Sequence, residues 1–312
     1  MTLGHGLNVS RVQRARQSLI AALACLSLGP AAFAGCGGDE PEPAAPPASA
    51  FDADRAFADL EAQVALGPRP SGSAANRRLT EQLAESLQDA GVQDIAIQRP
   101  LRNVVGILPG SQPGYVVVGA HHDTKDSIPG FVGANDGASG VAVVLELARS
   151  LPQPLPGPSI AIALFDGEEA RGDREFADDG TRGSRQYVAI AADGGQPGTP
   201  ALEEIRAMVL YDLVGDCDLD VPYEPNSDQA LYDLFAEADP ETFSGRTFPI
   251  DDDHIPFLEA GIPALDLIDF DYGPGPAPGE WWHSSEDTID KVCPESLGEI
   301  GAASLEALPR IP

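Results

Sequence analysis

The feature that most constrains the fold is a regular alternation of apolar and amphipathic segments from residue 115 onward. Nearly continuous apolar segments predict strands at 115–123, 159–169, 205–215 and 262–270. Segments with helical spacing of apolar residues lie between and after these strands, at 138–151, 183–192, 226–238, 255–261 and 296–308. Strands that are apolar on both faces are typical of parallel sheets covered by helices. The alternation therefore predicts an α/β fold with a largely parallel central sheet.

Two more helices and two more strands are expected before this region. Residues 51–66 and 73–91 have the apolar spacing of amphipathic helices, and they are separated by a rigid turn, GPRPSGS. Residues 95–98 and 102–108 are short apolar strands. Because no internal repeat is visible, we interpret residues 51–312 as a single domain.

Residues 1–35 are expected to be an export signal that is not part of the fold. A stretch with arginines and no acids (1–17) precedes an apolar run that is too short for a stable membrane-spanning helix. FAGC (33–36) resembles a bacterial lipobox with Cys36 as the lipidated residue, whereas AFA (32–34) also fits ordinary signal cleavage. We therefore expect an exported protein, either a cell-envelope lipoprotein or a secreted protein, that contacts a membrane only through a lipid anchor at Cys36.

The segment after Cys36 and the remaining cysteines fit this setting. Residues 36–50 are rich in proline and alanine, which is typical of a flexible tether. Cys217 and Cys293 are the two cysteines that follow the tether. In an oxidising compartment they could form a disulfide or remain as two buried thiols, and the sequence leaves both alternatives open.

The acidic composition excludes some classes of partner. The chain has 49 acidic and 19 basic residues and a formal net charge of −30. Such a surface argues against nucleic acid and anionic membranes as partners, because both carry negative charge. It keeps the protein dispersed and would attract cations or the N-termini of peptides.

Potential metal ligands follow the predicted strands. The residues concerned are His121, Asp123, Asp136, Glu168, Glu169, Asp212 and His283. In open α/β sheets, ligands bind beyond the carboxyl ends of the strands, so these side chains should meet at one edge. Several carboxylates there would repel one another unless a cation neutralised them. Nitrogen and oxygen donors without a thiolate suit zinc, although not uniquely.

These motifs, taken together, resemble the superfamily of zinc aminopeptidases and glutaminyl cyclases. The motifs are H-x-D at 121–123, GANDGASG, FDGEE, LYDLVG, DDHIPFLEAGIPA and WHSSEDTIDK. Their order and spacing match over residues 51–310. The resemblance implies a mixed, mostly parallel sheet sandwiched between helices, with peptide or protein N-termini as substrates.

The superfamily contains two chemistries. Its aminopeptidases hold two zinc ions, and the resemblance assigns the ligands to His121, Asp136, Glu169, Asp212 and His283. Asp136 would bridge the ions, and Glu168 would be the base that activates water.

Its glutaminyl cyclases hold one zinc ion and convert an N-terminal glutamine to pyroglutamate. The resemblance assigns zinc to Asp136, Glu169 and His283, and the proton shuttle to Glu168. It also implies an acidic pair near the substrate amine, Asp212 and Asp252, and a pocket wall formed by Trp282.

We favour the cyclase interpretation because DDHIPF and the aromatic residue before His283 are closer to that branch. The chain departs from known cyclases in two places: no second tryptophan follows Glu169, where Phe176 is the one aromatic residue, and Asp266 replaces a histidine. We expect Trp281 to be a packing residue and His254 to support the acidic network. A zinc-free binding lipoprotein is a third alternative, but no ligand is missing.

Overall fold

The computed structural model describes residues 51–312, which fall within one compact unit. The predicted export signal, the tether and the lipid anchor at Cys36 lie outside the described residues. None of the helices within 51–312 combines the length and the apolar character that crossing a membrane requires.

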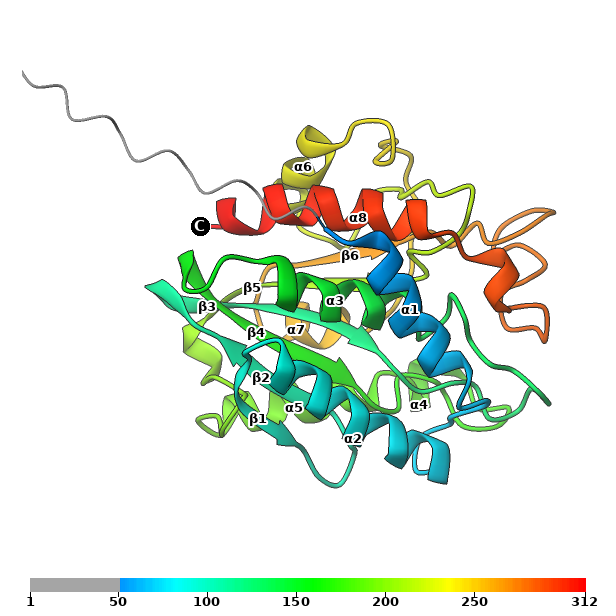
Figure 1. The fold of residues 1–312 in the computed structure, drawn as a ribbon, viewed down its shortest axis with the longest axis horizontal. Helices are drawn as coiled ribbons and strands as arrows, with labels where there is room; N and C mark the ends of the chain where they lie inside the picture. Colours follow the sequence, from blue (N-terminus) through cyan, green and yellow to red (C-terminus); the bar gives the residue numbers. More distant parts are fainter. Residues whose placement is uncertain (1–50) are drawn as a thin grey trace, which may run out of the picture. The chain divides into compact units, whose positions relative to one another are not determined.

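The core of the fold is a six-stranded sheet in the order β1-β2-β4-β3-β5-β6 (Figure 1). Its strands are β1 (Gln93–Ile97), β2 (Val104–Leu108), β3 (Gly110–His121), β4 (Leu155–Phe165), β5 (Ile205–Asp212) and β6 (Ala264–Ile268). The four strands β4, β3, β5 and β6 are parallel, whereas β1 pairs with β2, and β2 with β4, in antiparallel fashion. The prediction of a mixed, mostly parallel sheet is confirmed.

Helices cover both faces of the sheet (Figure 1). One face carries α1 (Ala53–Val64), α2 (Ala74–Asp89), α3 (Ser139–Ser150), α6 (Gln229–Ala238) and α8 (Pro294–Ala307). The other carries α5 (Arg182–Ala192) and α7 (Ile255–Glu259). Alternate residues of a strand point to opposite faces of the sheet. Val116 and Val118 therefore pack in the hydrophobic core on the α3 side, and Val117 packs in the core on the α5 side. Each layer therefore buries one side of the same strands.

Local signals explain where α1 and α2 begin. The side chain of Asp52 accepts a hydrogen bond from the backbone of Arg55 at the start of α1, and Ser73 does the same for Asn76 in α2. Such caps satisfy backbone N–H groups that have no partner within the helix.

The structure differs most from the sequence-based expectation in β3, β4 and α4. Strands β3 and β4 begin at Gly110 and Leu155, earlier than expected, because these proline-containing segments pair with each other across an irregular register. A short helix, α4 (Phe176–Asp179), was not predicted, since four residues are too few to show a helical period. The remaining predicted helices and strands are present with shifted ends.

Cys217 and Cys293 form a disulfide. It joins the loop after β5 to the residue before α8, across 76 positions of sequence. The structure thus settles the alternative that the sequence left open.

Candidate metal centre

The predicted ligands meet where the parallel strands end. His121 is the last residue of β3 and Asp212 the last of β5, and these two strands are neighbours. Glu169 follows β4, and Asp136 precedes α3. His283 belongs to the loop between β6 and α8. Five side chains from separate parts of the sequence therefore reach one edge of the sheet.

Two glycines explain the local sequence around Asp136. Gly137 has φ 91°, a conformation that other residues rarely adopt, and a Cβ there would lie 2.7 Å from the carbonyl oxygen of Asp123. A Cβ at Gly140 would lie 2.0 Å from the carbonyl oxygen of Tyr211. These glycines let the start of α3 approach β3 and β5 closely.

The five side chains form two triads that share Asp136. His121, Asp136 and Asp212 form the first, and Asp136, Glu169 and His283 form the second; in each, the potential ligand atoms lie within 4.8 Å of one another. The Nε2 atom of His121 is 3.2 Å from Asp136 Oδ1, whereas the Nε2 atom of His283 is 3.4 Å from Asp136 Oδ2. The two oxygens of Asp136 thus face different triads.

The chemistry of the triads fits zinc. All the donors are imidazole nitrogens or carboxylate oxygens, and Asp136, Glu169 and Asp212 are buried. The Nδ1 atom of His121 and the Oε1 atom of Glu169 have no hydrogen-bond partner. Burial and the charge of Asp136 raise the pKa of Glu169, and burial raises that of Asp212. A bound cation would relieve this cost of burying charge.

Glu168 lies beside the triads with a different environment. Burial raises the pKa of its carboxyl group well above the ordinary value, and the charges of Glu169 and Asp252 add to this effect. Its backbone N–H donates to Asp123 Oδ1 at 3.1 Å. A buried carboxyl group with a raised pKa is suited to exchanging protons near neutral pH.

The triads open into a cavity of about 400 Å³. Its acidic side is formed by Asp136, Glu168, Glu169, Asp212, Asp251 and Asp252. Its apolar side is formed by Phe176, Pro249, Ile250, Ile268, Phe270 and Trp282. Phe176 thus belongs to the apolar wall of the cavity. The cavity can hold a small amphipathic group with one end at the carboxylates and the other against the wall.

The two tryptophans lie in different surroundings. The ring of Trp282 stacks on that of His283, with centroids 3.9 Å apart and planes inclined by 16°. Phe270 packs its edge against the same indole at 5.0 Å. Trp281 instead contacts Tyr272 and lies 5.4 Å from Lys291 Nζ, beside another cavity. Trp282 therefore lies in the wall of the cavity against His283, whereas Trp281 packs outside this cavity.

A second acidic group adjoins the cavity, which Asp252 lines. Burial and the charges of Asp266 and Asp212 raise the pKa of Asp252 well above its ordinary value. His254 is fully buried between Glu224, whose Oε2 is 3.1 Å from Nε2, and Asp266, whose Oδ2 is 3.6 Å from Nδ1. His254 therefore belongs to the acidic network and not to the triads, as expected.

Arg69 is a buried residue that the sequence analysis did not single out. Its guanidinium donates to the carbonyl oxygens of His122, Val132 and Gly133, and so supports the loop that leads to Asp136. Burial lowers the pKa of Arg69 to about 10. In the sequence, only the position of Arg69 between two prolines after the first helix could have indicated a structural role for it.

Comparisons with known proteins agree with this geometry. Residues 103–308 match the family described as peptidase family M28. A glutaminyl-peptide cyclotransferase of Boiga irregularis is 32% identical over 242 residues, which cover 65% of this chain and 64% of the relative. The match thus spans slightly less than two thirds of that relative's length.

Solved structures extend the comparison over more of the chain. A glutaminyl cyclase from an Acidobacteriales bacterium has 30% identity and a TM-score of 0.75, covering 87% of this chain and 98% of that chain. A Zn-dependent exopeptidase from Parabacteroides distasonis has 27% identity and a TM-score of 0.71, covering 83% and 98%. A protein named a glutaminyl cyclase and a protein named a zinc-dependent exopeptidase thus both have folds similar to this one.

Proposed function

The chain belongs to peptidase family M28, and we propose that it is a zinc-dependent glutaminyl-peptide cyclotransferase. It would convert the N-terminal glutamine of peptides or proteins to pyroglutamate with release of ammonia. The observation that carries this proposal is the cavity beside the second triad. Its wall contains the aromatic residues Phe176, Phe270 and Trp282, and the buried Glu168, a group suited to carrying a proton, lines the same cavity. The similarity to named glutaminyl cyclases supports the same reaction.

Asp136, Glu169 and His283 would hold one zinc ion per chain. When bound, zinc supplies a Lewis acid that polarises the side-chain amide carbonyl of the substrate. The apolar and acidic sides of the cavity would then orient the remainder of the glutamine.

Glu168 would move the proton that the reaction transfers. The substrate α-amine must be neutral to attack the side-chain carbonyl carbon. Glu168 accepts a proton from the amine as the new C–N bond forms. It then returns the proton to the leaving ammonia as the old C–N bond breaks. Asp212 and Asp252, which line the same cavity, would hold the amine on the acidic side.

Trp282 would hold the glutamine in a folded conformation. A flexible chain loses conformational freedom when a five-membered ring closes, so a flat wall that selects the folded form lowers the barrier. The stacking of Trp282 on His283 fixes that wall beside the zinc ligand.

The first triad favours a second candidate function. His121, Asp136 and Asp212 lie within ligand distance of one another and could hold a second zinc ion. The protein would then be an aminopeptidase in which Glu168 activates a water molecule. The presence of all five ligand side chains argues against a zinc-free binding protein.

Mass spectrometry of two short peptides would test the function. With the zinc-loaded enzyme, a peptide beginning with glutamine is expected to lose one ammonia faster than in a control without enzyme, and a peptide beginning with leucine to remain intact. Loss of the whole first residue from the leucine peptide would reject the cyclase proposal in favour of the aminopeptidase.

Trp282→Ala is expected to lower kcat/KM for a glutamine peptide by roughly 10- to 100-fold, because the substrate loses the wall that orients it. The zinc content should remain near that of the wild type. Steady-state kinetics and metal analysis check the two effects separately. Trp281→Ala is the matched control and should lower kcat/KM much less than Trp282→Ala, because Trp281 lies outside this cavity. An equal loss of zinc and activity in Trp282→Ala would instead make Trp282 a support for His283.

We also propose that the protein is exported, as a lipoprotein anchored at Cys36 or as a secreted protein. The Cys217–Cys293 disulfide supports an oxidising compartment, where such bonds form and persist. The acidic side of the cavity is compatible with the cationic N-termini of peptides as partners.

A further inference from the structure

Three loops carry or adjoin the metal-binding side chains: 131–137 with Asp136, 213–217 directly after Asp212, and 281–293 with His283. We propose that Asn135 and Asp287 are positioning residues that join these loops. The Cys217–Cys293 disulfide completes the connection, so that the affinity for zinc falls when the disulfide is reduced. This inference depends on the metal centre alone and holds for either reaction.

Asn135 fixes the loop that follows Asp212. Its buried side chain accepts a hydrogen bond from Gly215 N at 2.8 Å and donates to the carbonyl oxygen of Leu213 at 3.4 Å. Leu213 has φ 49°, a left-handed conformation that costs free energy for a leucine. The contacts with Asn135 offset that cost and hold the residue next to Asp212 in place.

Asp287 fixes the backbone of Asp136 itself. Its carboxylate is fully buried and accepts hydrogen bonds from the backbone N–H groups of Asn135 at 2.8 Å and Asp136 at 3.1 Å. Tyr272 donates its hydroxyl to the same carboxylate at 2.7 Å. Because Asp287 and His283 belong to one loop, these bonds tie two ligands of the second triad together.

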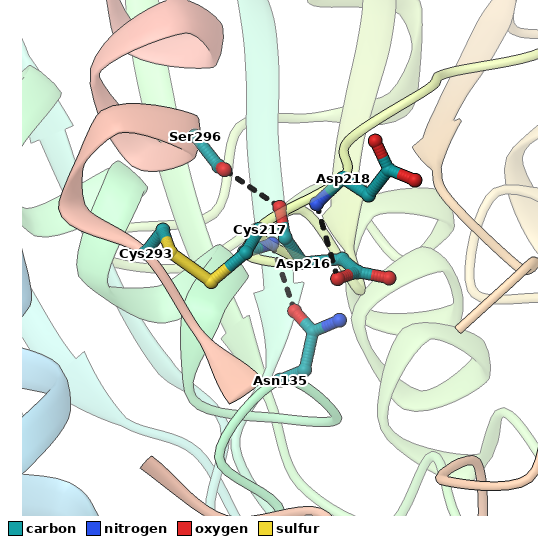
Figure 2. Close-up of a disulfide and its surroundings, with 7 residues drawn as sticks. Asn135, Asp216, Cys217, Asp218, Cys293 and Ser296 are labelled. Carbon is teal, nitrogen blue, oxygen red and sulfur yellow. Dashed lines mark hydrogen bonds between the residues drawn. A yellow bond between two sulfur atoms is a disulfide. The ribbon is translucent and has the colours of Figure 1, made fainter. Parts of the chain in front are cut away.

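The disulfide links the loop 213–217 to the loop 281–293. Figure 2 shows the bond beside Asn135 and the backbone of Asp216, whose carbonyl oxygen accepts a hydrogen bond from Ser296 Oγ at 2.6 Å. The backbone N–H of Cys293 donates to the carbonyl oxygen of Gly215 at 3.0 Å. Gly215 therefore bonds to Asn135 through its N–H and to Cys293, at the end of the loop 281–293, through its carbonyl oxygen.

A small dithiol can reach this bond. Cys217 is exposed and lines a cavity of about 760 Å³. A thiolate of the dithiol attacks one sulfur, so that the Cys217–Cys293 bond breaks, one cysteine leaves as a thiolate and a mixed disulfide forms. The second thiolate of the dithiol then attacks its own sulfur in the mixed disulfide, which breaks that bond and releases the other cysteine as a thiolate. The dithiol is oxidised to its cyclic disulfide, and Cys217 and Cys293 become thiols. The loops 213–217 and 281–293 then lose their covalent connection.

The zinc dissociation constant, measured by competition with a chromophoric chelator, tests the proposal. Removing groups that orient metal ligands typically weakens metal binding about 10- to 100-fold. Asn135→Ala and Asp287→Ala are expected to fall in that range. The double variant Cys217→Ser, Cys293→Ser should weaken binding by at least about 10-fold. Wild-type protein that has been reduced, alkylated and freed of dithiol should behave like the double variant, which covers the case that the variant does not fold.

A general loss of stability must be distinguished from a loss of positioning. Leu87→Ala is the control, because Leu87 is fully buried near the end of α2, where its carbonyl accepts from Val92 beside β1. This variant should lower the Tm of the metal-free protein and leave the dissociation constant for zinc unchanged. The proposal is overturned if the double serine variant binds zinc as the wild type does, or if Leu87→Ala weakens zinc binding to the same extent.

Discussion

Replacing Glu168 by glutamine is expected to lower kcat for glutamine cyclisation by about 10²- to 10⁴-fold, the range in which a positioned acid–base group contributes. Glutamine keeps the size of the side chain but cannot accept the proton of the α-amine. The carboxyl group of Glu168 lines the cavity next to Glu169, and its pKa is raised by burial. Since Glu168 belongs to neither triad, the variant should retain its zinc.

Kinetics with a glutamine peptide and metal analysis of the same preparation would check this expectation. Glu175→Gln is the matched control, because it makes the same chemical change at an exposed carboxylate outside the cavity. Retained turnover in Glu168→Gln would remove Glu168 from the mechanism. Loss of zinc together with turnover would mean that Glu168 supports the metal and does not only carry protons.

Asp136→Ala is expected to weaken zinc binding by more than about 100-fold, beyond the range for groups that only orient ligands, and to abolish activity. Asp136 is the residue common to both triads. Removing its carboxylate therefore removes a ligand whether the protein holds one zinc ion or two.

His121→Ala is the informative comparison for this variant. His121 belongs to the first triad only, so the proposed cyclase should still bind one equivalent of zinc. Because His121 Nε2 contacts Asp136 Oδ1, the affinity should fall by no more than about 100-fold, the range for groups that orient ligands. A wild type that binds two equivalents and a His121→Ala variant that binds one would favour the aminopeptidase. Isothermal titration of metal-free protein with zinc distinguishes these outcomes. Tight zinc binding by Asp136→Ala would contradict the proposed ligand set.

The gathering of His121, Asp136 and Asp212 could be predicted because parallel strands have all their carboxyl ends at one edge of the sheet. The resemblance added roles that spacing alone could not supply, such as the wall formed by Trp282. Phe176 could be named as a departure from the family, but its place in the cavity wall required the structure.

Arg69, Asn135 and Asp287 could not be assigned from the sequence, because their roles depend on hydrogen bonds between distant residues. Asp287 is 151 positions from Asp136, and no local pattern marks its carboxylate as a partner for that backbone N–H. Pairing between the first residues of β3 and β4 was missed for the same reason. Local spacing predicts which face is apolar, and it does not predict which polar atoms meet.

The two oxygens of Asp136 face different triads, and cations bound at both triads would therefore affect each other's binding. A carboxylate has one unit of negative charge, so a cation bound on one side reduces the attraction that remains for a cation on the other. By linkage, the effect is reciprocal, and the two positions would fill with unequal affinities. A one-ion enzyme and a two-ion enzyme could then share all five ligands and differ only in how far the weaker position is filled at the metal concentration around them.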